Sequence, residues 1–543
     1  MLKTLPIGND DFRDIRENHI YYVDKTLMIK DFIEYRDKVA LITRPRRFGK
    51  TLSMTMLREF FDITKDSKAI FSGLAIMDTT YAELINSKPV IYFTFKDCNA
   101  LDAGSLKIKL ADIVRREYAK YILAFGDTTD KSHPYYLRFY QVYEMLCRGE
   151  INEDYLSFSI GYLITAVFAF YGIKPIVLID EYDQPIISSY DHKYHDNLSD
   201  FFSSFYGQAL KGHGDLDLAL LTGIQRVAKE SIFSKLNNIM VYTVLDHKYA
   251  SYFGLTGEET QTLLQYYGLE LNEQVRAKYD GYLFGGIEIY NPWSILYYAD
   301  KKELDNYWIN TSTNSLIRES LREADSHFHK QFEQLLIDGE AKVGVMLETS
   351  FMELANRYTL WGLFINSGYL TVTDKHSQQM MTVQIPNNEV KSEFQALVAA
   401  YTKLPNENLS LMLQALMGQD MDEFLSIYRE LVLIYTSFYD AKENAYHMLF
   451  LGMVISLGNM YKVTSNIESG HGRSDIMMES KSSLHPHIII EFKQGRSVAK
   501  LKEQALQQIL DNRYFAGLAG KILCIGLAHN RKNCELAYKM IEN

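Results

Sequence analysis

The chain has 543 residues, more than one hydrophobic core usually holds, so we expect several domains. Its content of 47% hydrophobic and 23% charged residues is ordinary for a globular protein and excludes general disorder. A net charge of −11 argues against a general nucleic-acid coat, and the four cysteines lack the CxxC spacing of a zinc site.

Over residues 1–250, short apolar runs alternate with helix-like segments. The strand candidates are VALIT (39–43), PVIYFTF (89–95), PIVLID (175–180) and LDLALLTG (216–223). Continuous apolar strands separated by helices predict an α/β domain with a parallel sheet.

One helix candidate, residues 155–173, runs 19 residues without a charge and is therefore long enough for a membrane span. Its Gly, Ser and Tyr residues, and the buried-strand pattern that follows directly, favour a core helix instead. The N-terminus also lacks the basic start and apolar core of a signal peptide. We therefore expect a cytoplasmic protein with no membrane association.

The segment RPRRFGKT, Arg44 to Thr51, fits the phosphate-loop pattern GxxxxGK[ST] except at its first position. The backbone N–H groups of such a loop surround a phosphate at a helix N-terminus, and Lys50 and Thr51 would bind the phosphates and Mg²⁺. Arg44 replaces the first glycine, so we expect a negative φ there; a basic surface turn is the alternative. The predicted ATP-binding residues of this segment are Arg46, Arg47, Phe48, Gly49, Lys50, Thr51 and Leu52.

A second part of this site follows 130 residues later, where IVLIDE (176–181) is an apolar strand that ends in two acids. Asp180 would hold Mg²⁺, and Glu181 would orient or deprotonate the attacking water. The third strand ends in Thr222, a candidate γ-phosphate sensor, and is followed by Arg226, a candidate charge stabiliser. A solvated Thr and Arg at a strand end is the simpler alternative for these two.

Four stretches, IGNDDFRDIRENHIYYVDKTLMIKDFIE, RPRRFGKT, LIDEYDQPI and LLTGIQR, together resemble the bacterial AAA-ATPase-like family found beside PD-(D/E)xK nucleases. The resemblance spans roughly residues 5–235, and that family tolerates an arginine in the position of Arg44. It implies that Tyr22, Asp24 and Lys25 lie near the nucleotide or at the rim of the domain. A purely structural role is the alternative for these three residues.

Residues 251–345 are predicted to be a mainly helical lid or connector, with local turns at YDGYLFGG and YNPWS. Residues 346–404 hold two β-like segments, GYLTVTD and MMTVQIPN, between helical flanks. Two interpretations stay open for this unit, a small winged-helix-like module and a β-hairpin on a helical linker. These segments also resemble the connecting region of such proteins.

Residues 405–543 carry a second set of chemical groups. Asp475 precedes the apolar strand IIIEFK, in which Glu491 and Lys493 point to the same face because side chains alternate along a strand. The two carboxylates would bind Mg²⁺, and Lys493 would orient the nucleophile or stabilise the developing charge of a phosphodiester reaction. An edge strand with a surface ion pair is the alternative.

This C-terminal pattern, from ENAYH through SNIESGHGRSD and IIIEFK to ALQQILDNRYF, resembles the PD-(D/E)xK nuclease superfamily over about residues 440–530. The resemblance implies an α/β restriction-endonuclease-like domain, with Glu443 as a further metal ligand on its first helix. It also implies that Gln508, and with it Tyr514, borders the active site from a later helix. His447 and His471 are nearby, and a hydrogen-bonded or surface role is the simpler interpretation of both.

The charge distribution agrees with a local nucleic-acid face. Residues 443–543 carry 12 Lys and Arg against 9 Asp and Glu, whereas the rest of the chain has a balance of −14. The hypothesis from the whole sequence is an ATP-binding or ATP-hydrolysing protein that regulates Mg²⁺-dependent cleavage of DNA, rather than RNA. The domain pairing implies a role in defence against foreign DNA or in mobile-element biology.

The alternative is a signalling or scaffold ATPase whose nuclease-like domain binds nucleic acid or a partner without cleaving. A homo-oligomer is also considered, although no heptad or interface pattern supports a particular number of subunits.

Overall fold

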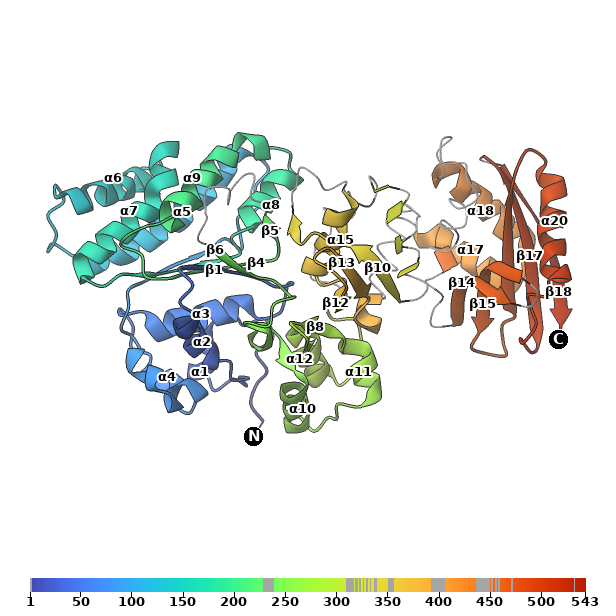
Figure 1. The fold of residues 1–543 in the computed structure, drawn as a ribbon, viewed down its shortest axis with the longest axis horizontal. Helices are drawn as coiled ribbons and strands as arrows, with labels where there is room; N and C mark the ends of the chain where they lie inside the picture. The colour runs from blue at the N-terminus through green and yellow to red at the C-terminus, as the bar shows by residue number, and fades with distance from the viewer. Residues whose placement is uncertain are drawn as a thin grey trace. The chain divides into compact units, whose positions relative to one another are not determined.

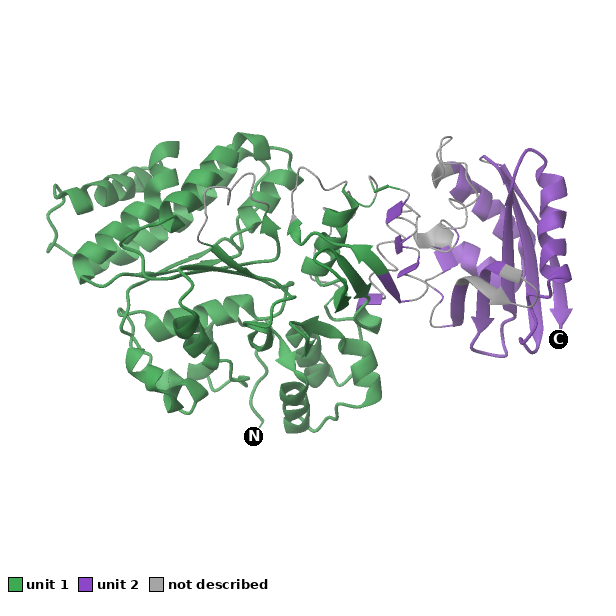
Figure 2. Ribbon diagram, in the orientation of Figure 1, with its two compact units in different colours: residues 1–325, 342–389 green, residues 326–341, 390–543 purple. Residues whose placement is uncertain are grey.

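The computed structural model describes residues 2–227, 239–308, 339–349, 356–391, 406–435, 460–469, 472–531 and 533–543, with isolated residues between 317 and 335 and between 450 and 457. The chain forms two compact units (Figure 2). Unit 1 is Met1–Asp325 with Lys342–Glu389, and unit 2 is Ser326–Ala341 with Val390–Asn543.

Unit 1 is built on a five-stranded parallel sheet with the order β2-β3-β4-β1-β6. The strands are β1 (Val39–Thr43), β2 (Val90–Thr94), β3 (Ile176–Asp180), β4 (Ala219–Gly223) and β6 (Ile239–Tyr242). The four predicted apolar runs all form strands of this sheet, which confirms the predicted α/β class. The edge strand β6 was not predicted.

Helices cover both faces of the sheet (Figure 1). On one face lie α1 (Phe12–Glu17), α2 (Leu27–Tyr35), α3 (Lys50–Phe61) and α4 (Lys68–Phe71). On the other lie α5 (Ala103–Phe125), α6 (Pro134–Cys147), α7 (Glu153–Tyr171), α8 (Gln184–Asp191) and α9 (Ser199–Leu210). Both faces of the central strands are therefore buried, which explains why their sequences are apolar without alternation.

Helix α7 is the uncharged stretch singled out in the sequence. Asn152 caps its N-terminus by accepting a hydrogen bond from Tyr155 N–H, and Gly172 ends it in the left-handed region. Its length and composition would suffice to cross a membrane, and 44% of its most apolar window is buried. Leu156, Ile160 and Leu163 belong to the core that this helix layer forms with the sheet.

After β6, unit 1 continues with α10 (Gly257–Tyr266), α11 (Glu273–Tyr279) and α12 (Pro292–Lys301) around a small sheet of order β7-β9-β8. Its strands are β7 (Leu255–Thr256), β8 (Tyr282–Phe284) and β9 (Ile287–Tyr290). The YDGYLFGG segment, expected as a turn in a helical region, thus contributes a strand and the turn of a hairpin. Aromatic side chains at its alternate positions Tyr282 and Phe284 are buried and stabilise the strand.

A second small sheet, of order β10-β13-β12, follows. Its strands are β10 (Glu340–Gly344), β12 (Thr371–Lys375) and β13 (Met380–Gln384), and α15 (Arg357–Asn366) packs beside the short strand β11 (Glu348–Thr349). The two predicted β-like segments form the antiparallel β12–β13 hairpin. Strand β11 pairs with β5 (Arg226–Val227), so this region is joined to the chain just after β4.

Unit 2 contains a five-stranded sheet of order β14-β15-β16-β17-β18. Its elements are α17 (Asn406–Gly418), α18 (Met421–Tyr435), β14 (Tyr461–Ser469), β15 (Gly472–Ser480), β16 (His487–Gln494), α20 (Val498–Asp511), β17 (Lys521–Asn530) and β18 (Asn533–Glu542). Only β16 and β17 are parallel, and α20 connects them; the other neighbours are antiparallel. The β15–β16 pairing brings the Asp475 strand beside the IIIEFK strand.

Candidate nucleotide and nuclease sites

The phosphate-loop segment lies between the end of β1 and the start of α3. Gly49 adopts φ +84°, a left-handed conformation that glycine takes without the steric cost of a side chain. The Lys50 Nζ donates hydrogen bonds to the carbonyl oxygens of Arg44 (3.0 Å) and Pro45 (2.9 Å). The side chain of Lys50 therefore binds the backbone of its own loop. Burial lowers the pKa of Lys50.

Arg44 occupies the first position of the loop without a positive φ, as predicted. Its guanidinium is buried, lies 5.5 Å from the ring centroid of Phe253 and 5.3 Å from that of Phe284, and donates to the carbonyl oxygen of Tyr242 (3.1 Å). Burial lowers the pKa of Arg44 to about 9. These contacts tie the start of the loop to the end of β6 and to the small β7–β9 sheet.

The acids of the second motif meet the loop at the carboxyl ends of β3 and β4. The buried carboxylate of Asp180 accepts hydrogen bonds from the Oγ1 of Thr51 (2.8 Å) and of Thr222 (2.6 Å). Glu181 follows in a left-handed conformation with φ +53°. Burial first, and then the charges of Asp180 and Asp183, raise the pKa of Glu181, while Lys50 opposes the shift.

Of the three arginines that were predicted to bind or stabilise phosphates, Arg47 and Arg226 have side-chain contacts elsewhere, whereas the charge of Arg46 acts on Lys50 and Glu181. The exposed Arg47 lies 3.9 Å from the ring centroid of Trp293, and the carbonyl oxygen of Arg46 accepts from Trp308 Nε1 (3.3 Å). Arg226 forms an ion pair with Glu348. The structure thus brings Lys50, Thr51, Asp180 and Thr222 together, whereas the contacts of Arg226 lead to β11.

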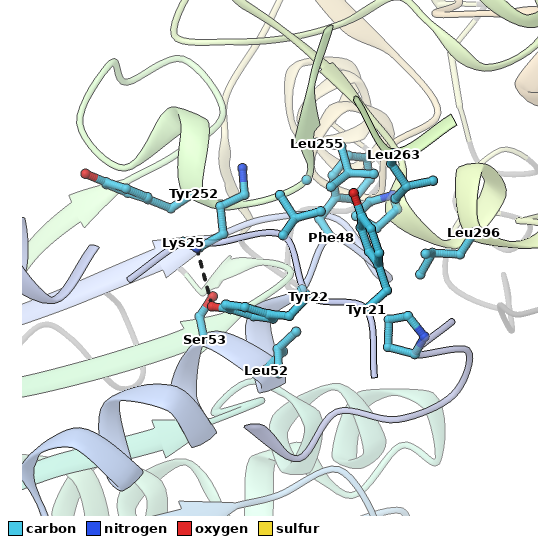
Figure 3. Close-up of a pocket in the computed structure, with 15 residues that line it drawn as sticks. Tyr21, Tyr22, Lys25, Phe48, Leu52, Ser53, Tyr252, Leu255, Leu263 and Leu296 are labelled. Atoms are coloured by element: carbon cyan, nitrogen blue, oxygen red, sulfur yellow. Dashed lines mark hydrogen bonds between the residues drawn. The ribbon is translucent and has the colours of Figure 1, made fainter. Parts of the chain in front are cut away.

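A pocket opens beside the N-terminus of α3 and is lined mainly by apolar and aromatic side chains (Figure 3). Gly49, Leu52 and Ser53 form its wall on the loop side, and Tyr21 and Leu263 are among the residues on the other sides. Phe48, also in the lining, packs at 5.1 Å between ring centroids on both Tyr282 and Phe284. The loop and the small β7–β9 sheet therefore share this pocket.

Two of the three signature residues Tyr22, Asp24 and Lys25 line this pocket. The hydroxyl of Tyr22 accepts from Lys25 N–H (3.4 Å), and Lys25 Nζ donates to Glu259 (2.7 Å) and to the carbonyl oxygen of Ser251 (2.6 Å). Asp24 instead accepts from the N–H groups of Thr26 and Ala75 and so braces the chain after the signature. Asp24 therefore has a structural environment, and Tyr22 and Lys25 border the pocket.

Sequence reasoning missed two residues that shape this site, Tyr182 and Asp183. The Asp183 carboxylate accepts from the backbone N–H of Ile224 (2.8 Å) and of Gln225 (2.7 Å). The Tyr182 hydroxyl donates to the carbonyl oxygen of Gln225 (2.7 Å). A Cβ on Gly223 would lie 2.6 Å from Asp183 Oδ1, so only glycine fits there. The available signal was the run DEYD, whose last acid, Asp183, needs partners when it is buried.

The second site, in unit 2, lies on β15, β16 and α20. Asp475 and Glu491 face one another closely enough for two hydrogen bonds between their strands: Phe492 N–H to Asp475 Oδ2 (2.7 Å) and Asp475 N–H to Glu491 Oε2 (3.4 Å). Lys493 Nζ lies 3.3 Å from Glu491 Oε1, and Gln508 Nε2 donates to the same oxygen. The predicted residues Asp475, Glu491, Lys493 and Gln508 therefore form one cluster.

The electrostatics of this cluster fit a divalent cation. Glu491 is 2% exposed, and burial together with the neighbouring Asp475 raises its pKa to about 7. Burial also raises the pKa of Asp475. The raised pKa values mean that Lys493 does not fully compensate the charged forms of these two carboxylates, and a divalent cation would do so; oxygen ligands of this kind suit Mg²⁺. Among the described residues, no group of three or more His, Cys, Asp or Glu side chains forms a candidate metal site.

Tyr514 supports Gln508 from beyond the end of α20, not from the helix itself. Its hydroxyl accepts from Gln508 Nε2 and from Asn512 Nδ2, both at 3.1 Å. Helix α20 ends at Asp511 because the chain turns at Arg513, which has a positive φ. The predicted metal ligand Glu443, and the nearby His447 and His471, lie outside the described residues.

A parallel sheet with a phosphate-type loop after its first strand, and acids after a neighbouring strand, defines unit 1 as a P-loop nucleoside-triphosphatase fold. Unit 2 combines a mixed sheet with the Asp475, Glu491 and Lys493 cluster, which is the arrangement of metal-dependent nucleases.

Comparisons with known families agree with both assignments. Residues 6–233 match the family described as a predicted AAA-ATPase, and residues 441–538 match the PD-(D/E)XK nuclease superfamily. The chain therefore joins an AAA-ATPase-like domain to a C-terminal domain of the PD-(D/E)XK nuclease superfamily.

The chain is also similar over nearly its whole length to a protein of Azotobacter chroococcum mcd 1, described as an uncharacterized protein in the vnfD 5' region. The two are 28% identical over 536 residues, which cover 94% of this chain and 93% of that protein. The match spans both domains of this chain.

Proposed function

We propose that the protein binds and hydrolyses ATP in unit 1 and thereby regulates Mg²⁺-dependent cleavage of DNA by unit 2. The observation that supports the nucleotide half most strongly is the meeting of Thr51, Thr222 and Asp180 beside Lys50 at one end of the sheet. In P-loop enzymes this is the place of the terminal phosphates and their metal ion.

The pocket beside α3 supplies room for the base and ribose. Because Leu52 and Ser53 follow the loop directly on α3, phosphates on the loop would direct the rest of a nucleotide into this pocket. Aromatic and aliphatic lining favours stacking of a purine. The charge of Lys25 is balanced by Glu259, and the described residues that line the pocket include no acid that could select guanine.

Each residue around the phosphates then has a distinct task. Lys50 would exchange its two backbone carbonyl partners for phosphate oxygens, and Thr51 with Asp180 would hold the metal ion. Glu181, whose pKa is raised, is the base or orienting group for water. Thr222, bonded to Asp180, would detect the γ-phosphate. Mg²⁺ would supply charge compensation for the transferring phosphoryl group.

In unit 2, Asp475 and Glu491 would hold Mg²⁺, which polarises a scissile phosphate and acidifies water. Lys493 lies beside Glu491 on the same face and would orient the nucleophile or balance the charge that develops on the phosphate. Gln508 fixes the Glu491 carboxylate. We propose DNA as the substrate, with RNA as an outcome to be tested, and a cytoplasmic protein without membrane association.

Binding of a fluorescent ATP analogue tests the first half. Lys50→Ala should abolish binding. The control is Lys107→Ala, which removes a lysine of α5 that is paired with Glu153 of α7; this variant should bind the analogue as tightly as the wild-type protein. Equal affinity of the Lys50→Ala variant would refute the loop assignment.

Cleavage of plasmid DNA in Mg²⁺ tests the second half. Lys493→Ala should abolish cleavage, and the control Lys462→Ala should not, because Lys462 forms an ion pair with Glu479 at the edge of the same sheet. If DNA is bound in Mg²⁺ and never cleaved, the alternative holds: a signalling or scaffold ATPase whose nuclease-like domain only binds. From the domain pairing alone, we also propose a setting in defence against foreign DNA or in mobile-element biology.

A further inference from the structure

The segment that follows β4, residues 224–227, is held by contacts with two different parts of unit 1. On the first side, Tyr182 and Asp183 bind its backbone directly after the acidic end of β3. This side fixes the distance between the loop and the two acids Asp180 and Glu181. It leaves the side chain of Gln225, which is 2% exposed, directed to a different part of unit 1.

On the second side, Gln225 meets the C-terminal end of α15, 141 residues further along the chain. Asn366 Nδ2 donates to Gln225 Oε1 and to the carbonyl oxygen of Leu347, both at 3.0 Å. Gln225 Nε2 in turn donates to Ser367 Oγ (3.3 Å). Asn366 is 2% exposed, so these amide hydrogen bonds are made away from solvent, where an unsatisfied partner is costly.

The same end of α15 also touches the phosphate loop. The backbone of Gly368 lies close to Pro45, since a Cβ built on Gly368 would be 2.9 Å from the Cβ of Pro45. Tyr282, which packs on Phe48 of the loop, donates to the carbonyl oxygen of Gly368 (3.0 Å). Residues 366–368 therefore contact both segments that would surround the γ-phosphate.

We propose that Asn366 is a positioning residue for ATP hydrolysis, acting through Gln225 on the loop that follows Thr222. This inference rests on the proposed nucleotide site. Thr222 lies directly before Gly223 and this segment. A shift of the segment would therefore also move Thr222 relative to Asp180. Small displacements of a group around a reacting phosphate cost roughly 10- to 100-fold in rate. The Asn366 side chain binds Gln225 and the carbonyl oxygen of Leu347 and does not line the pocket beside α3.

A purely structural role for Asn366 makes a different prediction. Loss of a buried amide pair would then lower stability and affect ATP affinity and turnover alike. A positioning role affects the hydrolysis step and leaves affinity nearly intact, because Lys50, Thr51 and the base pocket are unchanged. The two roles are therefore separated by measuring Kd and single-turnover rate on the same full-length variant.

The test compares Asn366→Leu, Gln225→Leu and the double variant with the control Asn387→Leu. Asn387 is also a buried asparagine in unit 1 that donates to a backbone carbonyl, that of Asp280 (2.8 Å). Fluorescent ATP binding gives Kd, and acid-quenched single turnover gives the hydrolysis rate. We expect Asn366→Leu to keep Kd within about threefold and to lose roughly 10-fold or more in rate, with the control unchanged in both.

The double variant shows whether Asn366 acts through Gln225. A rate equal to that of Gln225→Leu alone is expected, whereas multiplied losses would mean independent roles and overturn the inference. A wild-type rate in Asn366→Leu would also overturn it. If Asn366→Leu does not fold, as seen in its thermal melting, Gln225→Leu tests the same contact from the other end by the same criterion. If the wild-type protein binds no ATP, the proposed nucleotide site itself is refuted.

Discussion

Thr51 and Asp180, separated by 129 residues in the chain, are joined by a hydrogen bond of 2.8 Å between the Thr51 hydroxyl and the Asp180 carboxylate. This contact brings the phosphate loop on β1 to the acidic end of β3, although β4 lies between those two strands in the sheet. Asp180 is fully buried and has a second hydroxyl partner in Thr222. The site is thus a small network, and removal of either threonine hydroxyl leaves the buried Asp180 with one hydrogen bond fewer.

Thr222→Val should weaken both the fold and hydrolysis. The substitution keeps the shape of the side chain and removes the hydroxyl that donates to Asp180 at 2.6 Å. A hydrogen bond to a charged buried group contributes about 1.5–3 kcal/mol, so we expect a loss of that size in unfolding free energy. Urea unfolding measures it. Thr222→Ser keeps the hydroxyl, and equal instability of the Ser and Val variants would contradict the role of this hydrogen bond.

Glu181→Gln should separate ATP binding from hydrolysis. Glu181 is placed to act on water, and general-base groups contribute about 10²–10⁴-fold to rate. We expect unchanged affinity for ATP and at least a 100-fold slower single turnover, about the lower limit of that range. A variant that hydrolyses ATP normally would show that another group performs this step.

Gln508→Leu should slow DNA cleavage without loss of the fold. Gln508 donates to the Glu491 carboxylate, so its removal frees a metal-binding side chain to turn away. Supporting contacts to metal ligands are worth about 10–100-fold in activity. The neighbouring Gln507 provides the control, because it is exposed and bonds only to Asp511 among the described contacts. Equal cleavage rates for Gln508→Leu and Gln507→Leu would count against this support.

Unit 2 should lose stability in mild acid through His529. Burial lowers the pKa of His529 to about 3, whereas an unfolded histidine titrates near about 6.5. Between pH 6.5 and pH 3, roughly, the unfolded chain binds a proton at His529 that the folded chain does not bind. The stability that neutral His529 contributes is therefore complete above about pH 6.5 and falls as the pH falls below it. The expected loss between pH 7 and pH 5 is about 2 kcal/mol.

His529→Gln should remove this part of the pH dependence, while the less buried His485→Gln should retain it. The full chain is unfolded in urea at pH 7 and at pH 5, and proteolytic cleavage within unit 2 reports how much of that unit is unfolded. The comparison of the two variants measures the difference in pH dependence. Identical pH dependence in the two variants would mean that another group titrates.

The sequence predicts those parts of the fold that depend on local patterns. The four apolar runs mark β1 to β4, and the period-2 spacing of Glu491 and Lys493 places their side chains together, as their 3.3 Å contact shows. The absence of a positive φ at Arg44 could also be predicted, since a side chain makes the left-handed conformation that glycine would take unfavourable there.

The remaining features depend on contacts between distant segments. Nothing local in the sequence indicates that Arg226 pairs with Glu348, 122 residues further along, because an arginine after a strand fits a phosphate contact equally well. The same holds for Asn366 and Gln225, which become partners only through the pairing of β5 with β11. The sequence does not predict hairpin β8–β9, because its strands are stabilised by the burial of aromatic side chains against distant segments. A short segment rich in turn residues does not show that such burial occurs.

The central claim is that nucleotide in unit 1 controls cleavage by unit 2. Its most direct test is the initial rate of plasmid cleavage in Mg²⁺, with and without ATP, for the unchanged chain and for Lys50→Ala. We predict that ATP changes the rate of the unchanged chain by about 10-fold, a typical allosteric coupling of 1–3 kcal/mol, and leaves the Lys50→Ala rate unaffected. Equal rates with and without ATP in the unchanged chain would contradict the claim.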